Sequence, residues 1–589
     1  MVQTTSGLPA KGSTFFRGSP LEPPRAGMMP RTSPVSANAN HPPLACAGAV
    51  SIPARKRTHN TASLPRPQTA TLIRPRFGQL HRVCRTLPVV AVGGHRPDWR
   101  RSGQVKRCGP KEFRGCCGTT PHAAVTARPG RCRLMAEKCA VVFDCGSTNI
   151  TVVAVAPDGR ILASASRPNE FAPDPEGQPG WLIWDMEALW GRLCGAAQEM
   201  VAGLAGAEPV ACAVTTWGAD GAPVRADGTL TFPPIAWACP RTEPLAARWA
   251  NLMDPWDTYC ETGYQVIPFN TLLKLIWLRE NRPGALDEAE CWMMMAGLLN
   301  HRLCGEKSVD ATAAGTTMAV DMARRAWSAK MLSLAGLTAD FFPRWVEPGS
   351  VIGQLSQPAA ADTGLPPGIP VVAAGHDTQF AAVGACARPG EAILSSGTWE
   401  ILMLRDPNYH PTKLGYDEGV LIEFDSEPGL WNPQLLMMGS GVLEWLRDLA
   451  FADLANRADR YEIEAAEASK VPPGAEGLVF LPSFVPSTGP TKKYGTRGSL
   501  LGLELATSRG HLMRAALEGL SFQLRQALGI LSEATGYDIK AVRVVGGGSK
   551  NALWNRLRAD VTGLPVVVTA QKEATVVGAA LFALVGAGV

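Results

Sequence analysis

The chain has 589 residues, of which 46% are hydrophobic and 19% charged, and its formal net charge is +5. This composition excludes a disordered or fibrous protein, and the length predicts two to four domains at about 150 residues each. No uninterrupted apolar run reaches the roughly 18 residues that a membrane span needs, so no membrane association is expected.

Charge and composition divide the chain near Met135. Residues 1–134 contain 22 Lys and Arg but three acidic residues, a net charge of +19, whereas the remainder has 35 basic and 49 acidic residues, a net charge of −14. The first segment is rich in Pro, Arg, Ser and Thr and has no sustained helical or strand period, which predicts a disordered basic extension. A transit peptide and a mis-assigned start are the alternatives, and we favour a true start at Met135.

The cysteine pattern is typical of a reducing compartment. Nine of the 15 cysteines follow Met135 in scattered apolar contexts, and the six before it lack the paired C-x-x-C spacing of zinc sites. Free thiols and a cytoplasmic location are therefore expected, with no metal in the extension.

The first patterned region alternates strands and turns. Strands are predicted over 139–144, 151–156 and 160–166, and a polar break separates the first two. The break opens with Asp144 and continues with Gly146, Ser147, Thr148 and Asn149. A carboxylate followed by a glycine and hydroxyl groups can form a phosphate cradle with Mg²⁺ near the aspartate. The alternative is a purely structural β-hairpin with polar residues in its turn, in which the aspartate caps that turn.

A helix and a second polar turn come next. Asp185 is the predicted N-cap of an amphipathic helix over 186–204, and a buried strand is predicted over 210–217. That strand ends in a glycine-rich loop in which Gly218 allows close approach of a sugar hydroxyl and Asp220 accepts hydrogen bonds from one. The alternative is a structural loop whose tryptophan folds into the core. Two more helices are predicted over 271–282 and 292–303.

A third polar turn, "AAGHDTQ" over 373–379, lies between an apolar strand and a helix of small residues. An aspartate at such a junction commonly caps the helix. Alternatively, Asp377 accepts a proton from a substrate hydroxyl while His376 and Thr378 hold the substrate around it.

The second half of the chain repeats the opening arrangement. Residues 391–404 are predicted as strand, Ser-Ser-Gly-Thr turn and strand, which suggests two related domains with a boundary between about 380 and 392. A long helix over 509–531, a strand over 541–545 and a helix over 551–561 follow. The three glycines before the last helix, Gly546, Gly547 and Gly548, allow close approach to a flat or anionic ligand or form a tight structural connection. Neither a dinucleotide fingerprint nor a Walker A sequence is present.

In this order, the motifs resemble those of the FGGY carbohydrate kinases over about residues 139–585. The strings "TTWGADG", "AGHDTQFA", "SSGTWEILM" and "VVGGGSKNALWN" are most similar to members that phosphorylate L-fuculose. The resemblance implies an α/β fold of two ribonuclease-H-like (actin/hexokinase-type) domains flanking an ATP and sugar cleft. The expected sugar-binding and phosphate domain is 135–385, and the expected nucleotide-binding domain is 386–589.

The resemblance also implies a role for each motif. Asp377 is the expected catalytic base, and Asp144 is the expected metal ligand. The expected sugar contacts are Gly218, Asp220, His376 and Thr378. The expected ATP contacts are Gly146, Ser147, Thr148, Asn149, Thr398, Gly546, Gly547 and Gly548.

The implied reaction is ATP-dependent phosphorylation of the C1 hydroxyl of L-fuculose, with Mg²⁺. The alternative substrates are L-rhamnulose, D-xylulose and D-ribulose. The other alternative is a non-catalytic or ATPase-only protein in which closure around the nucleotide drives an interaction with a partner. It is disfavoured, because a protein that only binds nucleotide does not need a base at Asp377. If residues 1–134 bound nucleic acid, the binding would depend on salt and would disappear when these residues are deleted. Neither nucleic acid nor membrane is an expected partner. The oligomeric state is left open.

Overall fold

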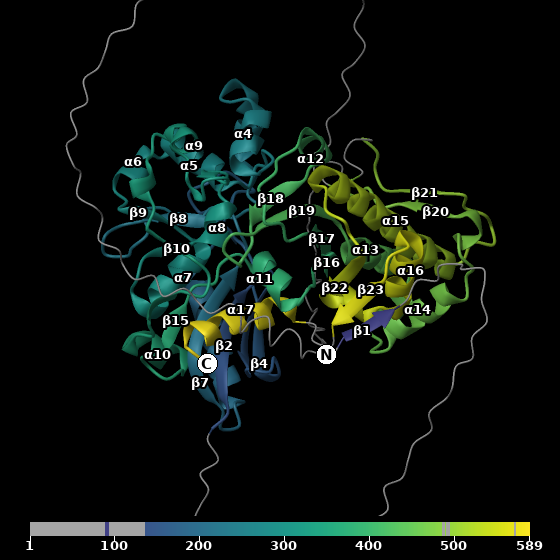
Figure 1. Ribbon diagram of the computed structural model, residues 1–589, viewed down its shortest axis with the longest axis horizontal. Helices are drawn as coiled ribbons and strands as arrows, with labels where there is room; N and C mark the ends of the chain where they lie inside the picture. Colours follow the sequence, from purple (N-terminus) through teal and green to yellow (C-terminus); the bar gives the residue numbers. More distant parts are fainter. Residues whose placement is uncertain (1–88, 93–135, 486–488, 491–494, 570–572) are drawn as a thin grey trace, which may run out of the picture. The chain divides into compact units, whose positions relative to one another are not determined.

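The computed structural model describes residues 89–92 and 136–589, except 486–488, 491–494 and 570–572. Two mixed sheets dominate this part of the chain (Figure 1), with the orders β14-β15-β7-β2-β3-β4 and β1-β23-β22-β16-β17-β19-β18. The strands of the first sheet are β2 (Lys138–Cys145), β3 (Asn149–Val155), β4 (Ile161–Pro168), β7 (Glu208–Thr216), β14 (Val351–Gln354) and β15 (Pro370–Val372). Those of the second are β1 (Val89–Val92), β16 (Glu391–Ser396), β17 (Trp399–Met403), β18 (Leu421–Phe424), β19 (Trp431–Met438), β22 (Ala541–Val545) and β23 (Val566–Thr569).

The strand directions bring distant polar turns to the same edge of each sheet. In the first sheet β15, β7 and β2 run parallel, and β2, β3 and β4 form antiparallel hairpins. In the second sheet β16, β22 and β23 run parallel, and β16, β17, β19 and β18 pair antiparallel. Ligands of such sheets bind beyond the carboxyl ends of the parallel strands.

Two helices lie between the sheets and pack on both of them. Helix α11 (Asp377–Gly384) and helix α17 (Ala574–Gly586) lie side by side (Figure 1). Apolar residues of both helices pack against inward-facing residues of the first sheet, such as Val142 and Val153. Alanines at 381, 382 and 574 pack against Ile393 and Val545 of the second sheet. The helix pair is therefore a shared layer of the core.

Glycines permit the close crossing of these two helices. A Cβ built on Gly384 would lie 1.8 Å from the carbonyl oxygen of Ala574, and one on Gly578 would lie 2.0 Å from that of Phe380. Real Cβ atoms do not approach backbone this closely, so any side chain at either position forces the helices apart.

We expect Gly578→Ala to lower the free energy of unfolding by about 1–3 kcal/mol, because overpacking displaces a helix shared by both sheets. Gly529→Ala is the matched control, since Gly529 is an exposed helical glycine of α15 (Arg509–Thr535) with nothing within 4 Å of an added Cβ. The control substitution should stabilise by roughly 0.5–1 kcal/mol. Urea unfolding of both variants checks the prediction, and equal stabilities would contradict the close crossing.

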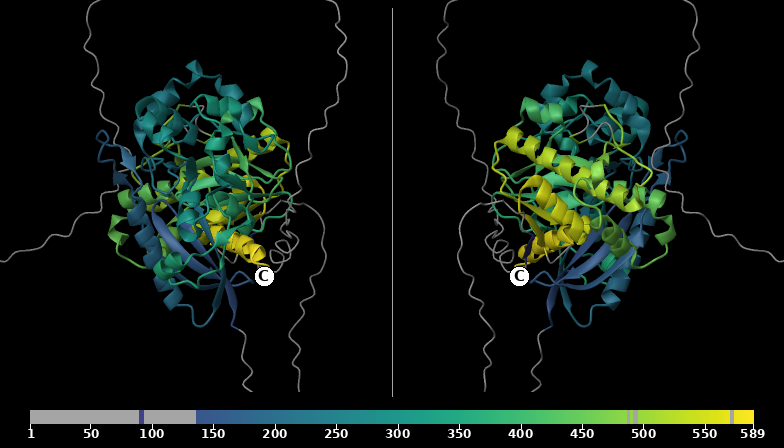
Figure 2. Two further views of the ribbon diagram at one scale, coloured as in Figure 1. Left: turned by 90° about the vertical axis from the view of Figure 1, so that its left-hand side faces the viewer. Right: turned by 90° about the vertical axis from the view of Figure 1, so that its right-hand side faces the viewer.

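Further helices cover the outer faces of the two sheets. Apolar residues of α2 (Met186–Ala202), α7 (Met295–Cys304) and α10 (Gln357–Thr363) pack with the first sheet. The long helix α15 (Figure 2) and α16 (Ala552–Thr562) cover the second sheet. The predicted N-cap of α2 is confirmed, because the Asp185 carboxylate accepts from the backbone N–H groups of Glu187 and Ala188.

Three observations concern the remaining sequence predictions. The helix predicted over 292–303 begins later than expected, because Cys291–Met294 forms strand β9, which pairs with β8 (Gly221–Val224). Val89–Val92 forms β1, antiparallel to β23, so the predicted disorder does not hold for these four residues. The rest of 1–134 lies outside the described residues. In the ranges that the structure describes, no helix combines the length and apolarity that crossing a membrane requires.

Candidate active site

Three strand ends of the first sheet bring two predicted site aspartates to one edge. The parallel register of β2 and β7 sets Asp144 opposite Thr215, whose hydroxyl donates to the Asp144 Oδ1 atom at 3.0 Å. Thr216, the last residue of β7, forms a parallel bridge with His376, which directly precedes Asp377. Residues far apart in the sequence thus meet where the parallel strands end.

The two carboxylates differ from ordinary surface aspartates. Burial, together with the nearby carboxylate of Asp377, raises the pKa of Asp144 to about 7. Burial also raises the pKa of Asp377, against the opposing effects of the His376 charge and of hydrogen bonds from Thr378. Asp377 is the first residue of α11, and His376 is its N-cap, so the aspartate is not the capping residue. A pair of partly buried carboxylates with raised pKa values is typical of a catalytic site.

The first polar turn is held by a residue that the sequence analysis did not single out. The Gly146 N–H donates to the carbonyl of Asn149 at 2.9 Å, and a Cβ on the glycine would lie 2.9 Å from that same oxygen. Asn169 donates from its side chain to the Gly146 carbonyl at 2.9 Å and from its N–H to the Thr148 carbonyl at 2.8 Å. The hydrogen bonds from Asn169 therefore hold the backbone of the turn, while Thr148 and Asn149 remain exposed.

In the second sheet, the strand-turn-strand motif and the glycine loop touch each other. The parallel register of β16 and β22 pairs Ser395 with Val545. A Cβ on Gly546, whose φ is 81°, would lie 2.7 Å from the Ser396 carbonyl oxygen, and one on Gly548 would lie 2.1 Å from the Ser396 hydroxyl. The glycines are therefore required for the loop to lie directly on the end of β16.

The turn after β16 also meets the start of a helix. The Thr398 carbonyl accepts from the N–H groups of Gly439 and Gly441 at 3.0 and 3.2 Å, beside the start of α13 (Ser440–Ala450). A buried ion pair connects the two strands that flank this turn. Arg558 donates to Glu400 of β17 and, at 2.7 Å, to the hydroxyl of Ser396, the last residue of β16. Neither member of the pair was predicted from the sequence.

The structure corrects the predicted role of Asp220. Its side chain is fully buried. Its carboxylate accepts from the indoles of Trp184 and Trp217 at 2.6 and 2.8 Å, from the Trp237 N–H at 3.1 Å and from the ammonium of Lys274. With four donors already bound, the carboxylate has no direct access to a sugar hydroxyl, and it instead holds the indoles. The alternative interpretation, in which the tryptophan of this loop folds into the core, is confirmed.

Of the other predicted sugar contacts, His376 and Thr378 flank Asp377 in the chain, and Gly218 lies in the loop after β7. The Thr378 N–H and hydroxyl donate to Asp377 Oδ1 at 2.5 and 3.1 Å. The His376 N–H donates to the Thr312 hydroxyl at 2.9 Å. Gly218 packs against Thr316, whose Cγ2 atom would lie 2.7 Å from an added Cβ. This glycine is therefore required by the packing of the protein itself.

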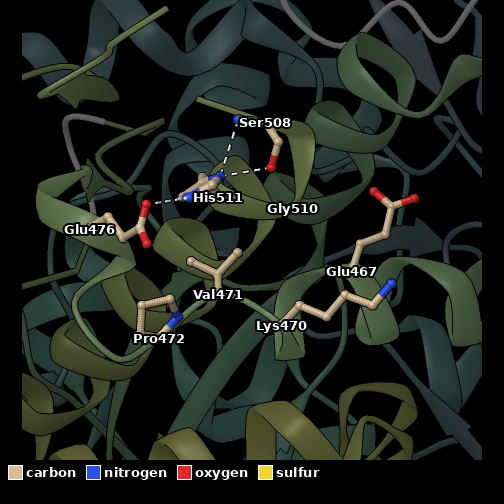
Figure 3. A pocket seen from close by; sticks show the side chains of 8 residues that line it. All are labelled: Glu467, Lys470, Val471, Pro472, Glu476, Ser508, Gly510 and His511. Carbon is tan, nitrogen blue, oxygen red and sulfur yellow. Dashed lines mark hydrogen bonds and ion pairs between the residues drawn. The ribbon is translucent and has the colours of Figure 1, made fainter. Parts of the chain in front are cut away.

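A separate pocket in the C-terminal half (Figure 3) contains none of the predicted site residues. It is lined by Glu467, Lys470, Val471, Pro472, Glu476, Ser508, Gly510 and His511. Ser508 and His511 bond each other as the capping box of α15, and the His511 ring also bonds Glu476 at 3.0 Å. These contacts have the structural role of starting a long helix.

Solved structures define the class of protein to which this fold belongs. The xylulose kinase from Rhodospirillum rubrum matches with a TM-score of 0.67 and 26% identity, over 76% of this chain and 90% of that one. The glycerol kinase from Plasmodium falciparum, solved with ADP, matches in fold with a TM-score of 0.68 at 21% identity, over 77% and 90%. The fold is thus the two-domain α/β architecture of sugar kinases, as predicted.

The chain belongs to the FGGY family of carbohydrate kinases. The family's N-terminal domain matches residues 139–384 and its C-terminal domain matches 392–587. L-fuculokinase from Escherichia coli (strain K12) is 39% identical over 77% of this chain and 93% of its own length. L-fuculokinase from Haemophilus influenzae is 35% identical over 76% and 95%. The autoinducer-2 kinase of Salmonella typhimurium is 28% identical over 76% and 86%. The predicted family resemblance is confirmed, and the chain is a carbohydrate kinase.

Proposed function

We propose that this kinase transfers the γ-phosphoryl group of ATP to the C1 hydroxyl of L-fuculose, giving L-fuculose 1-phosphate and ADP. The substrate follows from the similarity to two L-fuculokinases, each matched over more than nine-tenths of its length. The observation that carries the reaction type is the meeting of Asp144 and Asp377 at one sheet edge, where each has a raised pKa.

In the proposed mechanism, Asp377 accepts the proton of the C1 hydroxyl as that oxygen attacks the γ-phosphorus. Phosphoryl transfer requires positioning, charge neutralisation and a base for the acceptor. The Thr378 donors reach Asp377 Oδ1, which orients the carboxylate so that Oδ2 serves the hydroxyl. The pKa of Asp377 is raised by burial, and a stronger base than an ordinary aspartate favours the proton transfer.

Asp144, near the end of β2, would hold a Mg²⁺ ion together with the phosphates of the nucleotide. Among the described residues, no cluster of three or more His, Cys, Asp or Glu side chains could hold a metal. Magnesium at kinase sites is commonly held by one or two carboxylates together with substrate phosphates, which matches this donor set. When bound, the ion neutralises negative charge on the phosphate oxygens.

The polar turns supply the proposed ATP contacts. Gly146, Ser147, Thr148 and Asn149 would donate to phosphate oxygens from the first domain, and Thr398 from the second. Gly546, Gly547 and Gly548 would lie against the adenosine. An added Cβ on Gly547 would meet nothing within 4 Å, so the backbone at this glycine is open to a ligand. His376, Thr378 and Gly218 are the proposed sugar contacts, and Asp220 holds the neighbouring indoles in place.

A substrate panel tests the proposed function. The full chain is assayed for sugar-dependent ADP release with L-fuculose, L-rhamnulose, D-xylulose, L-ribulose, D-ribulose and glycerol. We expect the highest kcat/KM with L-fuculose, because the relatives that match over most of their length are L-fuculokinases. A higher kcat/KM with another ketose would contradict the proposed substrate while retaining the reaction, and no sugar-dependent release from folded protein would contradict the reaction itself.

A further inference from the structure

A buried arginine of α16 connects the glycine loop (546–548) to the strands beside it. Helix α16 packs on β23 (Figure 1) and starts directly after the loop, with Asn551 as its N-cap. Arg558 follows about two turns later, and its side chain is 1% exposed. Its Nη2 atom donates to the Ser396 hydroxyl at 2.7 Å and to the Glu400 carboxylate. Its Nη1 atom donates to the side-chain oxygen of Asn555 at 2.9 Å. The guanidinium therefore bonds residues of β16, β17 and α16.

Two contacts join this arginine to the backbone of the glycine loop. Asn555, which accepts from Arg558, donates from its side-chain nitrogen to the Ser549 carbonyl at 2.8 Å. Gly548 lies against the second partner of the arginine, since an added Cβ would be 2.1 Å from the Ser396 hydroxyl. The loop is thus held at two points, and both lead to Arg558.

The acid of the pair reaches the turn after β16 (397–398). Glu400 lies on β17 and is fully buried. A Cβ on Gly439 would lie 2.6 Å from the Glu400 Cγ atom and 2.8 Å from the Gly397 carbonyl oxygen. The Gly439 N–H also donates to the Thr398 carbonyl at 3.0 Å, so Glu400 packs against a residue that closes the turn. The ion pair therefore lies between the glycine loop and the turn after β16.

This ion pair is expected to contribute little to stability. Among the described residues, Glu400 Oε2 and Arg558 Nε are buried without a hydrogen-bond partner. The guanidinium lies 3.7 Å from the ring centroid of Trp554, a cation–π contact that compensates only in part for the lost water. Removing two charges from water costs more than an incompletely bonded pair returns. The effect of the pair is therefore expected in the geometry of the segments that it connects.

We propose that Arg558 is a positioning residue for ATP, which fixes the glycine loop relative to the turn after β16. It acts on the loop through Asn555 and Ser396, and on the turn through Glu400. The proposed contacts of the adenosine and of the phosphates then have a preset spacing, which lowers the entropic cost of binding one ligand that spans both. The inference rests on the proposed function, since it concerns the ATP contacts of that reaction, and it adds residues that do not touch the nucleotide themselves.

The first test replaces both members of the pair by methionine. Arg558→Met with Glu400→Met leaves no unpaired buried charge, and methionine adapts to irregular spaces, so the protein should fold. We expect the Kd for ATP, measured by calorimetric titration, to rise by about tenfold or more, because the spacing is no longer preset. The KM for the sugar preferred in the substrate panel should stay within about threefold, since the proposed sugar contacts lie in the first domain. An unchanged Kd for ATP, or an equal change in both constants, would overturn the proposal.

Arg447→Met with Glu464→Met is the matched control, because it removes a second buried arginine–glutamate pair of the same domain. Arg447 donates to Glu464 at 2.7 Å, and its guanidinium lies 4.6 Å from the ring centroid of Tyr461. Neither member belongs to the proposed ATP contacts. The control should leave the Kd for ATP within about twofold of the unmodified protein. An equal loss of ATP affinity in both double variants would show that the loss is not particular to Arg558, which would also overturn the proposal.

A second variant keeps the buried pair and releases only the loop. Asn555→Asp retains an oxygen for Arg558 but loses the donor to the Ser549 carbonyl. AMP contains the adenosine without the β- and γ-phosphates, so the Kd for AMP should rise by about tenfold, as should that for ATP. An unchanged Kd for AMP would overturn the proposal, whether or not the methionine variant folds. The same titrations measure ATP binding by the unmodified protein, and its absence there would contradict the proposed function itself, which distinguishes the two failures.

Discussion

Replacing Asp377 with asparagine is expected to lower kcat by about 10²–10⁴-fold, the usual contribution of a positioned general base. The substitution keeps the size of the side chain and removes its ability to accept a proton. ATP binding should persist, because the predicted phosphate and adenosine loops lie on other segments of the chain. Single-turnover phosphorylation of the sugar, together with calorimetric titration of ATP, measures the two quantities separately.

The control for this substitution is Asp538→Asn, an aspartate whose side chain is 82% exposed. It should retain the turnover of the unmodified enzyme. If Asp377→Asn also retained near-normal turnover, Asp377 would not be the base, and the proton would have to go directly to solvent or to a phosphate oxygen.

The second large effect is expected for Asp144→Asn, which should reduce turnover by about 10²-fold or more, because electrostatic stabilisation by a metal ion is worth several kcal/mol. The apparent affinity for Mg²⁺ should weaken in parallel. Titration of activity against Mg²⁺ concentration measures both. An unchanged Mg²⁺ dependence would show that Asp144 is not a ligand.

The same variant should be more stable than the unmodified protein at alkaline pH. The folded-state pKa of Asp144 is raised to about 7 by burial and by Asp377, above its ordinary value of 3.8. As pH rises from about 4 to 7, the unfolded chain loses this proton first, so the group lowers stability progressively and the penalty is complete above pH 7. Asparagine lacks that penalty. Melting temperatures of both proteins without ligands at pH 5 and pH 8 check the sign, and a lower value for the variant at pH 8 would contradict it.

Local sequence signals predicted the elements that position the site. Alternating strands and helices, the Asp185 N-cap and the polar turns at strand ends each have a short-range signature, and the structure contains them near the expected residues. The parallel register then brings Asp144 and the turn at Asp377 together. That register follows from the α/β pattern, so the meeting of the two motifs could be anticipated.

The residues that support the site could not be predicted in this way. Asn169, Glu400 and Arg558 act through partners on distant segments, and no local period marks such a pairing. Asp220 was misassigned for a similar reason, since three of its four donors, Trp184, Trp237 and Lys274, come from outside its own loop. A polar residue in a loop has the same local signature whether it faces a ligand or a buried indole.

The late start of α7 has a related cause. The apolar run Cys291–Met294 that precedes the helix fits a buried strand as well as a helix. Pairing with β8, a tertiary interaction, decides for the strand. The shared layer of α11 and α17 also depends on contacts between segments nearly two hundred residues apart, which only the packed structure reveals.

The most direct test of the central claim is proton-coupled ³¹P NMR of the product formed by the full chain from ATP and L-fuculose. L-fuculose is a 6-deoxyketose whose one primary hydroxyl is at C1. The phosphorus of an ester at C1 couples to the two methylene protons of that carbon and gives a triplet. The phosphorus of an ester at a secondary hydroxyl couples to one proton and gives a doublet. The account predicts stoichiometric ADP and a new phosphomonoester triplet that Asp377→Asn does not produce. A doublet, or ADP formation without any sugar phosphate, would contradict it.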